Sequence, residues 1–186
     1  MTWIIITLVV ALILGPIMYL VPTPKDKRLS ALRLAARKAG LVVKISSLPK
    51  LDPQAFERVT AGGKALEPKI ACTAYELPMP QGLSGFGEFS LLRLPPEPTV
   101  SINEVLPGWS LQPNSTAWVA YMASQESVAT LTKSLASLPP DSVGFSVNAR
   151  YVACYWQERA TVEDTRIAEI QSALSVIADD LVARYG

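Results

Sequence analysis

Carboxylates and thiols are the side chains of this sequence that could do acid–base or nucleophilic chemistry. Five glutamates stand at expected strand ends or in loops, where two of them could meet as an acid–base pair: Glu76, Glu88, Glu97, Glu104 and Glu158. Such a pair needs burial to raise the pKa of one carboxyl group, and the spacing marks no two of them as neighbours. Cys72 and Cys154 are flanked by apolar residues, which is typical of buried thiols.

Several common catalytic sites are excluded by composition. The 186 residues include no histidine, which rules out Ser-His-Asp and Cys-His hydrolases and HExxH metalloproteases. Two cysteines are too few for a cysteine-based zinc site, and the glycines of residues 82–87 lack the lysine of a phosphate-binding loop. A net charge of +1 argues against a dedicated nucleic-acid binder. We therefore expect no enzymatic activity, no cofactor, no metal site and no nucleic-acid partner.

Hydrophobic periodicity predicts an α+β domain over residues 41–186. Helical spacing of apolar residues predicts amphipathic helices over 125–138 and 162–185, the second opening with a capping box at residues 161–164. Strands are expected over residues 41–45, 70–77, 86–94, 117–122, 143–147 and 151–156, with loop or edge structure in 49–68 and 95–113. Runs of strands favour a mixed or mainly antiparallel sheet, which the two amphipathic helices would cover on one face.

Residues 1–24 are predicted to form a transmembrane anchor. The nineteen residues from Trp3 to Val21 carry no charge and, as a helix, would span roughly 28 Å of a hydrocarbon core of about 30 Å. Trp3 and Tyr19 would lie at the two headgroup regions, and Gly15 with Pro16 would give a kink. The alternative is a cleaved signal peptide, although the segment has no basic start and no small-x-small cleavage site.

Basic residues after the anchor predict its orientation. Residues 25–44 hold seven lysines or arginines and one acid, which places the amino terminus outside and the domain in the cytoplasm of a bacterial inner membrane. Residues 25–40 read as a basic juxtamembrane helix with Gly40 as its C′ glycine. Two interpretations stay open for its basic residues, a solvated face or contact with lipid headgroups: Lys25, Lys27, Arg28, Arg33, Arg37 and Lys38.

Aromatic residues gather in the second half of the chain. Most are expected in the core, but Trp109 in its Pro-Gly loop, together with Tyr155 and Trp156, could instead lie in a partner interface, where Trp and Tyr are enriched.

The opening of the chain resembles the YajC-like family of small single-pass bacterial inner-membrane proteins. The matching residues are the proline-containing exit and basic stretch from Pro22 to Arg28 and the run Gly40-Leu41-Val42-Val43, within the first quarter of the chain. The resemblance implies the same single-pass topology.

The sequence therefore predicts a membrane-tethered, non-enzymatic interaction module, an accessory or assembly subunit of an inner-membrane complex. Its expected partners are the lipid bilayer and a membrane protein. The alternative is a membrane-anchored domain that senses a ligand or lipid in a pocket between sheet and helices.

Overall fold

The computed structural model describes residues 2–6, 11–12, 23–159 and 165–186. The chain divides into two compact units, Met1–Ala31 and Leu32–Gly186. Helix α2 (Pro24–Lys38) begins in the first unit with a reciprocal cap and ends in the second. Thr23 Oγ1 accepts a hydrogen bond from the Asp26 amide at 3.2 Å, and the Thr23 amide donates to Asp26 Oδ2 at 3.1 Å. Pro24 occupies the first helical position, where its missing N–H costs nothing.

The prediction of a transmembrane helix over residues 3–21 is contradicted. No helix within the described ranges is long and apolar enough to cross a membrane. The two long described helices are amphipathic or basic, since α2 carries six lysines or arginines and α5 (Thr165–Tyr185) is interrupted by charged residues. Most of the predicted span, including Gly15, Pro16 and Tyr19, lies outside the described residues. The single-pass inner-membrane localisation that depended on this helix is therefore not supported.

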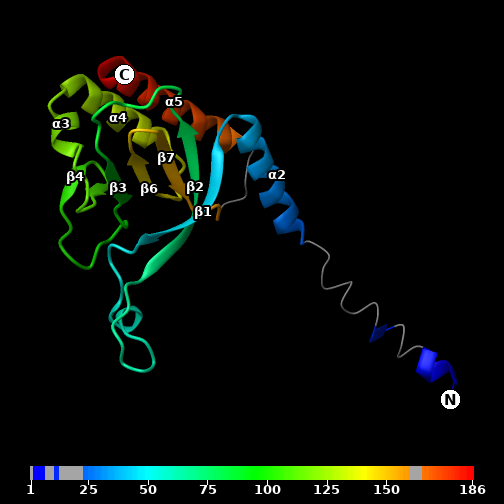
Figure 1. Ribbon diagram of the computed structural model, residues 1–186. Helices are drawn as coiled ribbons and strands as arrows, with labels where there is room; N and C mark the ends of the chain where they lie inside the picture. The colour runs from blue at the N-terminus through cyan, green and yellow to red at the C-terminus, as the bar shows by residue number, and fades with distance from the viewer. Residues whose placement is uncertain (1, 7–10, 13–22, 160–164) are drawn as a thin grey trace. The chain divides into compact units, whose positions relative to one another are not determined.

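The second unit contains a seven-stranded, fully antiparallel sheet (Figure 1). This confirms the mainly antiparallel α+β prediction for residues 41–186. The order across the sheet is β1 (Val42–Pro49), β2 (Lys69–Pro78), β7 (Tyr151–Trp156), β6 (Ser142–Val147), β3 (Phe89–Arg93), β5 (Trp109–Leu111) and β4 (Glu104–Leu106).

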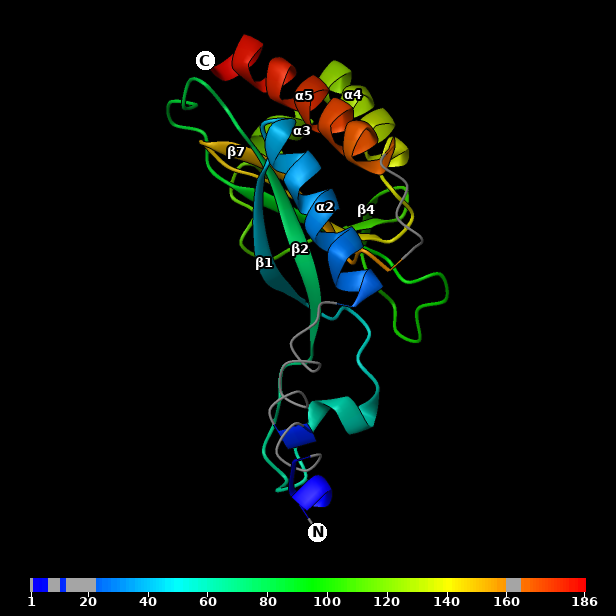
Figure 2. The same ribbon diagram turned by 90° about the vertical axis from the view of Figure 1, so that its right-hand side faces the viewer.

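Helices α4 (Gln125–Ser137) and α5 cover one face of this sheet, as predicted (Figures 1 and 2). Ser124 caps α4 by accepting a hydrogen bond from the Ser127 amide at 3.3 Å. The residues expected to cap α5, 161–164, lie outside the described residues. Leu32 and Ala36 of α2 join the same core. Gly40, at φ 83°, ends α2 in a Schellman motif, with Leu41 N–H bonded to Ala36 and Gly40 N–H to Arg37.

The expected strand over residues 117–122 is wrong, because the segment forms helix α3 (Trp118–Met122). Trp118 and Tyr121 are buried while Val119 is 79% exposed, a spacing of three that suits a helix. A six-residue apolar run is too short for periodicity to separate strand from helix. The regions expected as loop contain the edge strand β4, its neighbour β5 and a short 3₁₀ helix, η1 (Ala55–Arg58).

The two faces of the sheet differ in side-chain size. The helix-covered face carries large apolar residues, including Tyr75, Phe89, Phe145 and Trp156. The opposite face also carries Glu76 and Leu92, but most of its residues are small or hydroxyl-bearing: Ala74, Ser90, Ser110, Gly144, Ser146, Ala153 and Tyr155. A side chain at Gly144 would collide with Leu48, so the far end of β1 folds over this second face.

Candidate functional site

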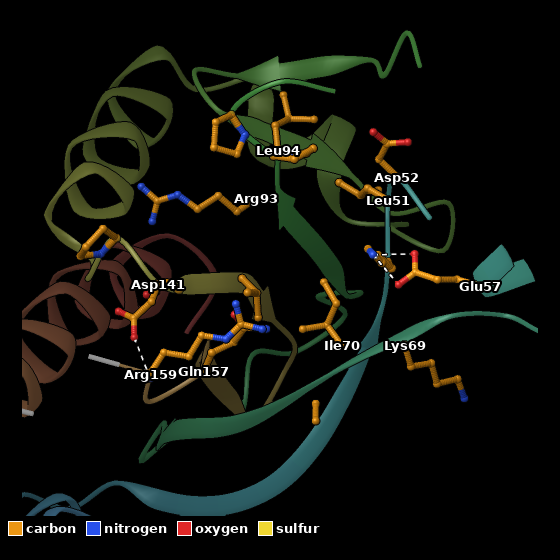
Figure 3. Close-up of a pocket in the computed structure, with 17 residues that line it drawn as sticks. Leu51, Asp52, Glu57, Lys69, Ile70, Arg93, Leu94, Asp141, Gln157 and Arg159 are labelled. Carbon is orange, nitrogen blue, oxygen red and sulfur yellow. Dashed lines mark hydrogen bonds and ion pairs between the residues drawn. The ribbon is translucent and has the colours of Figure 1, made fainter. Parts of the chain in front are cut away.

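A cavity of about 700 Å³ lies at the end of the sheet where β1, β3 and β7 end and β2 and β6 begin (Figure 3). Antiparallel pairing brings these strand ends together although they lie far apart in the sequence. Residues next to each strand end line the cavity: Lys50, Leu51, Lys69, Ile70, Arg93, Leu94, Asp141, Gln157 and Arg159. Sequence reasoning missed this site. Its signal was a charged residue beside the same end of five strands, which is readable only once the strand order is known.

Every acidic side chain of the cavity wall already accepts hydrogen bonds. Asp52 accepts from the Thr99 amide at 2.6 Å and hydroxyl at 2.5 Å, and the hydroxyl bond in particular lowers the pKa of that carboxyl group. Glu57 accepts two bonds from Lys50 Nζ, at 2.6 and 2.7 Å, which lower its pKa. Asp141 accepts from the Arg159 amide at 3.2 Å.

Two arginines supply most of the remaining positive charge. Arg93 donates one hydrogen bond, from Nη1 to the Pro139 carbonyl at 2.9 Å, and its guanidinium lies 5.4 Å from the centre of the Trp109 ring. The guanidinium of Arg159 has no bonding partner among the described residues. Figure 3 shows Arg93, Asp141 and Arg159 on one side of the cavity and Leu51 and Ile70 on the other, with Lys69 pointing away. Asp52 and Glu57 lie on the side of Leu51 and Ile70, so the cavity places two arginines across from apolar side chains that stand among hydrogen-bonded carboxylates.

Arg33, one of the predicted headgroup residues, forms an ion pair within the protein. Its Nη2 and Nε bind the Glu158 carboxylate at 2.6 and 3.2 Å, and Tyr75 donates to the same carboxylate at 2.6 Å. The bond to Glu158 raises the pKa of Arg33, and burial raises that of Tyr75. Glu158 is buried and has a φ of 51°, unusual for a residue with a side chain. This cluster ties the second half of α2 to the covered face of the sheet.

The other predicted headgroup residues lie on exposed positions of α2: Lys25, Lys27, Arg28, Arg37 and Lys38. They agree with the solvated-face interpretation, and lipid contact by them stays a prediction.

The aromatic residues expected at an interface are mainly core residues. Trp109 and Trp156 are buried, and the Trp156 ring lies 5.8 Å from that of Tyr75. Tyr155 is half-buried on the opposite face, where its hydroxyl lies 3.1 Å from Ser146 Oγ. The core interpretation thus accounts for both tryptophans.

The candidate acid–base carboxylates are held apart by the sheet. Glu76 is buried beside Lys44, with 2.6 Å between its Oε2 and Lys44 Nζ, while Glu158 binds Tyr75. Tyr75 and Glu76 are consecutive residues of β2, so their side chains point to opposite faces of the sheet. Glu158, which is bound to Tyr75, therefore lies on the other side of the sheet from Glu76. Glu104 accepts from the Gly108 amide. Cys72 and Cys154 are buried free thiols, as expected, and burial raises the pKa of Cys154 to about 12.

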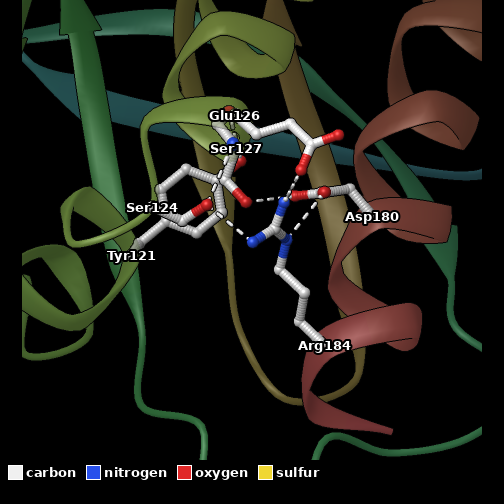
Figure 4. A network of polar contacts seen from close by, with 6 residues as sticks. All are labelled: Tyr121, Ser124, Glu126, Ser127, Asp180 and Arg184. Carbon is white, nitrogen blue, oxygen red and sulfur yellow. Dashed lines mark hydrogen bonds and ion pairs between the residues drawn. The ribbon is translucent and has the colours of Figure 1, made fainter.

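A polar network joins the start of α4 to the end of α5 (Figure 4). Arg184 binds Asp180 at 2.9 Å, the Ser124 hydroxyl at 2.6 Å and Glu126 at 3.2 Å. Ser127 donates to the other Asp180 oxygen at 2.7 Å, and Tyr121 donates to the Ser127 carbonyl at 3.1 Å. Each of these groups is used to hold the helices together, which makes the network structural.

Beyond the cavity, the chain between β1 and β2 forms a hairpin tip, defined here as residues 54–66. Backbone bonds order it: Leu66 N–H binds Arg58, Thr60 N–H binds Lys64, and Val59 pairs with Ala65. The tip stands apart from the body of the sheet in both ribbon views (Figures 1 and 2). Its apolar side chains are open to solvent: Phe56 is 74% exposed, Leu66 52% and Val59 49%.

Comparison with known proteins does not place the chain in a family. No family model matches the sequence, and no curated protein is similar to it, so the YajC-like resemblance stays a prediction. The structure is similar to the crystal structure of the mycobacterial trehalose monomycolate transport factor A, TtfA, with a TM-score of 0.43 and 13% identity over 81% of this chain and 92% of that chain. Similarity at this level supports no inference about fold or function.

Proposed function

We propose that this protein is a non-enzymatic interaction module that binds a partner protein through its hairpin tip. The observation that carries this proposal is the exposure of Phe56, Val59 and Leu66 on a segment whose backbone is ordered by its own hydrogen bonds. An ordered segment loses little conformational entropy on binding, and exposed aromatic residues are common anchors of protein interfaces.

The charges of the tip indicate the kind of surface it fits. Within residues 54–66, Glu57 forms an ion pair with Lys50, which leaves Arg58 and Lys64 as the remaining charged residues of the tip. A matching partner would offer an apolar pocket rimmed by carboxylates, because complementary charge speeds association and selects the partner.

Site-specific photo-crosslinking tests this function. A benzophenone amino acid at position 56 should give one discrete crosslinked product in the native host, whereas the same group at the equally exposed Val119 should not. The product should disappear when Val59 and Leu66 are both replaced by serine and persist in Val176→Ser. Identical products from positions 56 and 119, or a product indifferent to the tip substitutions, would refute the proposal.

A further inference from the structure

We propose that the cavity at the end of the sheet binds a small amphiphilic anion, with its carboxylate or phosphate group at Arg159 and its apolar body against Leu51, Ile70 and Leu94. This site is separate from the hairpin tip, and neither proposal depends on the other.

The size of the cavity suits such a ligand. Its volume of about 700 Å³ falls within the range of small-molecule sites, roughly 300–1,000 Å³. Leu51, Ile70 and Leu94 are each half-buried in its wall, so a ligand could cover apolar surface that now faces water.

The charges of the cavity select the sign of the ligand. The three carboxylates are engaged, Asp52 by Thr99, Glu57 by Lys50 and Asp141 by the Arg159 amide. These bonds make the three carboxylates less available to a cationic ligand. In contrast, the Arg159 guanidinium has no acceptor within the described part of the chain, and Arg93 engages a single carbonyl through Nη1.

The chemistry of guanidinium favours a planar or tetrahedral oxyanion. Arginine presents parallel N–H donors that match the two oxygens of a carboxylate or phosphate. Placing that head group at Arg159 directs the rest of the molecule across the cavity, toward the apolar side seen in Figure 3. The arrangement thus requires both parts of an amphiphile, and an inorganic anion would use only one of them.

Calorimetric titration of the 186-residue chain with four probes tests this site, with the two amphiphiles kept below their micelle concentrations and octan-1-ol below its solubility limit. Octyl phosphate and octanoate distinguish the two head groups, while octan-1-ol and inorganic phosphate each lack one half of the ligand. At least one of the two amphiphiles should bind saturably and at least tenfold more tightly than octan-1-ol and inorganic phosphate. Arg159→Gln should weaken that binding at least tenfold, Ile70→Ser should weaken it without changing the affinity for inorganic phosphate, and Lys133→Gln, on the exposed side of α4, should leave it unchanged.

Three outcomes would overturn the proposal. If octan-1-ol bound as tightly as both amphiphiles, the binding would be non-specific apolar contact. If inorganic phosphate bound as tightly as the amphiphiles, the site would hold an adventitious ion only. An unchanged affinity in Arg159→Gln, with amide spectra proving the variant folded, would place the ligand elsewhere. If the cavity proposal fails in this way, the crosslinking result expected at position 56 is not affected.

Discussion

Trp156 and Tyr155 are neighbours in β7, yet they belong to different environments. Trp156 lies fully buried under the helices among large apolar side chains, while Tyr155 lies half-buried on the opposite face among serine, glycine and alanine. Alternation along one strand thus separates a face built for stability from a face whose small residues let the end of β1 fold across it. Burial of apolar area stabilises the first face far more, so substitutions should rank accordingly.

The largest expected effect is on the covered face, at Trp156. Trp156→Ala should lower the free energy of unfolding by about 3–5 kcal/mol, because it leaves a cavity beside Tyr75. Trp156→Phe should cost less than half as much, since the indole Nε1 has no hydrogen-bond partner within the described residues. Urea denaturation measures both. Equal losses in the two variants would mean that the ring volume is not what stabilises this face.

The next effect is expected at Glu158, where the covered face contains its buried ion pair. Glu158→Gln should cost about 2–3 kcal/mol, because it removes the charge that Arg33 and Tyr75 bind in a poorly solvated position. Arg33→Met in the Glu158→Gln background should cost less than Arg33→Met alone, which a double-mutant cycle by urea denaturation measures.

Glu126→Gln is the matched control for this cycle. The Glu126 carboxylate also binds an arginine, Arg184, but it is 86% exposed, so its loss should leave the stability unchanged. A cost at Glu126 comparable to that at Glu158 would contradict the distinction between buried and exposed pairs.

Alkaline pH should also lower the free energy of unfolding, through groups buried on the covered face. Burial raises the pKa of the Cys154 thiol from 9.0 to about 12 and also raises that of Tyr75, so both groups stay neutral in the folded protein. When a folded pKa exceeds the unfolded value, the stabilisation is complete below the unfolded pKa and is lost as pH rises toward the folded one. Stability should therefore fall above pH 9, by roughly 1.4 kcal/mol per pH unit for each group that ionises only on unfolding.

Comparing wild type with Cys154→Ala at pH 8 and pH 10 isolates the thiol from the lysines and other tyrosines. The variant should lose less stability over this interval than the wild type does. Parallel pH profiles of the two proteins would show that Cys154 does not contribute.

The sequence allowed the covered face to be predicted, because its signals are local. Phe145 and Val147 alternate with small residues, and Leu131 and Leu135 recur at helical spacing, so β6 and α4 could be located without knowing their partners. The helix α3 was missed since Trp118–Met122 is too short to show its period. The transmembrane prediction is contradicted because no helix within the described ranges is long and apolar enough to cross a membrane.

The candidate sites could not be predicted in the same way. Arg93 and Arg159 are separated by four strands and two helices in the sequence, and they meet only because antiparallel pairing aligns the ends of β3 and β7. Phe56 lay in a segment without pattern, and its exposure depends on η1 and the Val59–Ala65 bridge standing clear of the sheet. Strand order, and the exposure of a segment without regular periodicity, depend on the whole fold, so the local pattern did not predict them.

The smallest effect is expected on the opposite face, at the hydrogen bond between Tyr155 and Ser146. Tyr155→Phe should cost about 1 kcal/mol, the usual net value of one partly buried hydrogen bond. Ser146→Ala should cost a similar amount, and the double variant should cost less than the sum, because removing both partners leaves no polar atom unsatisfied. Urea denaturation of the three variants measures this coupling. If Tyr155→Phe proved as damaging as Trp156→Ala, this face would be a second core, and the small residues along it would need an explanation other than room for β1.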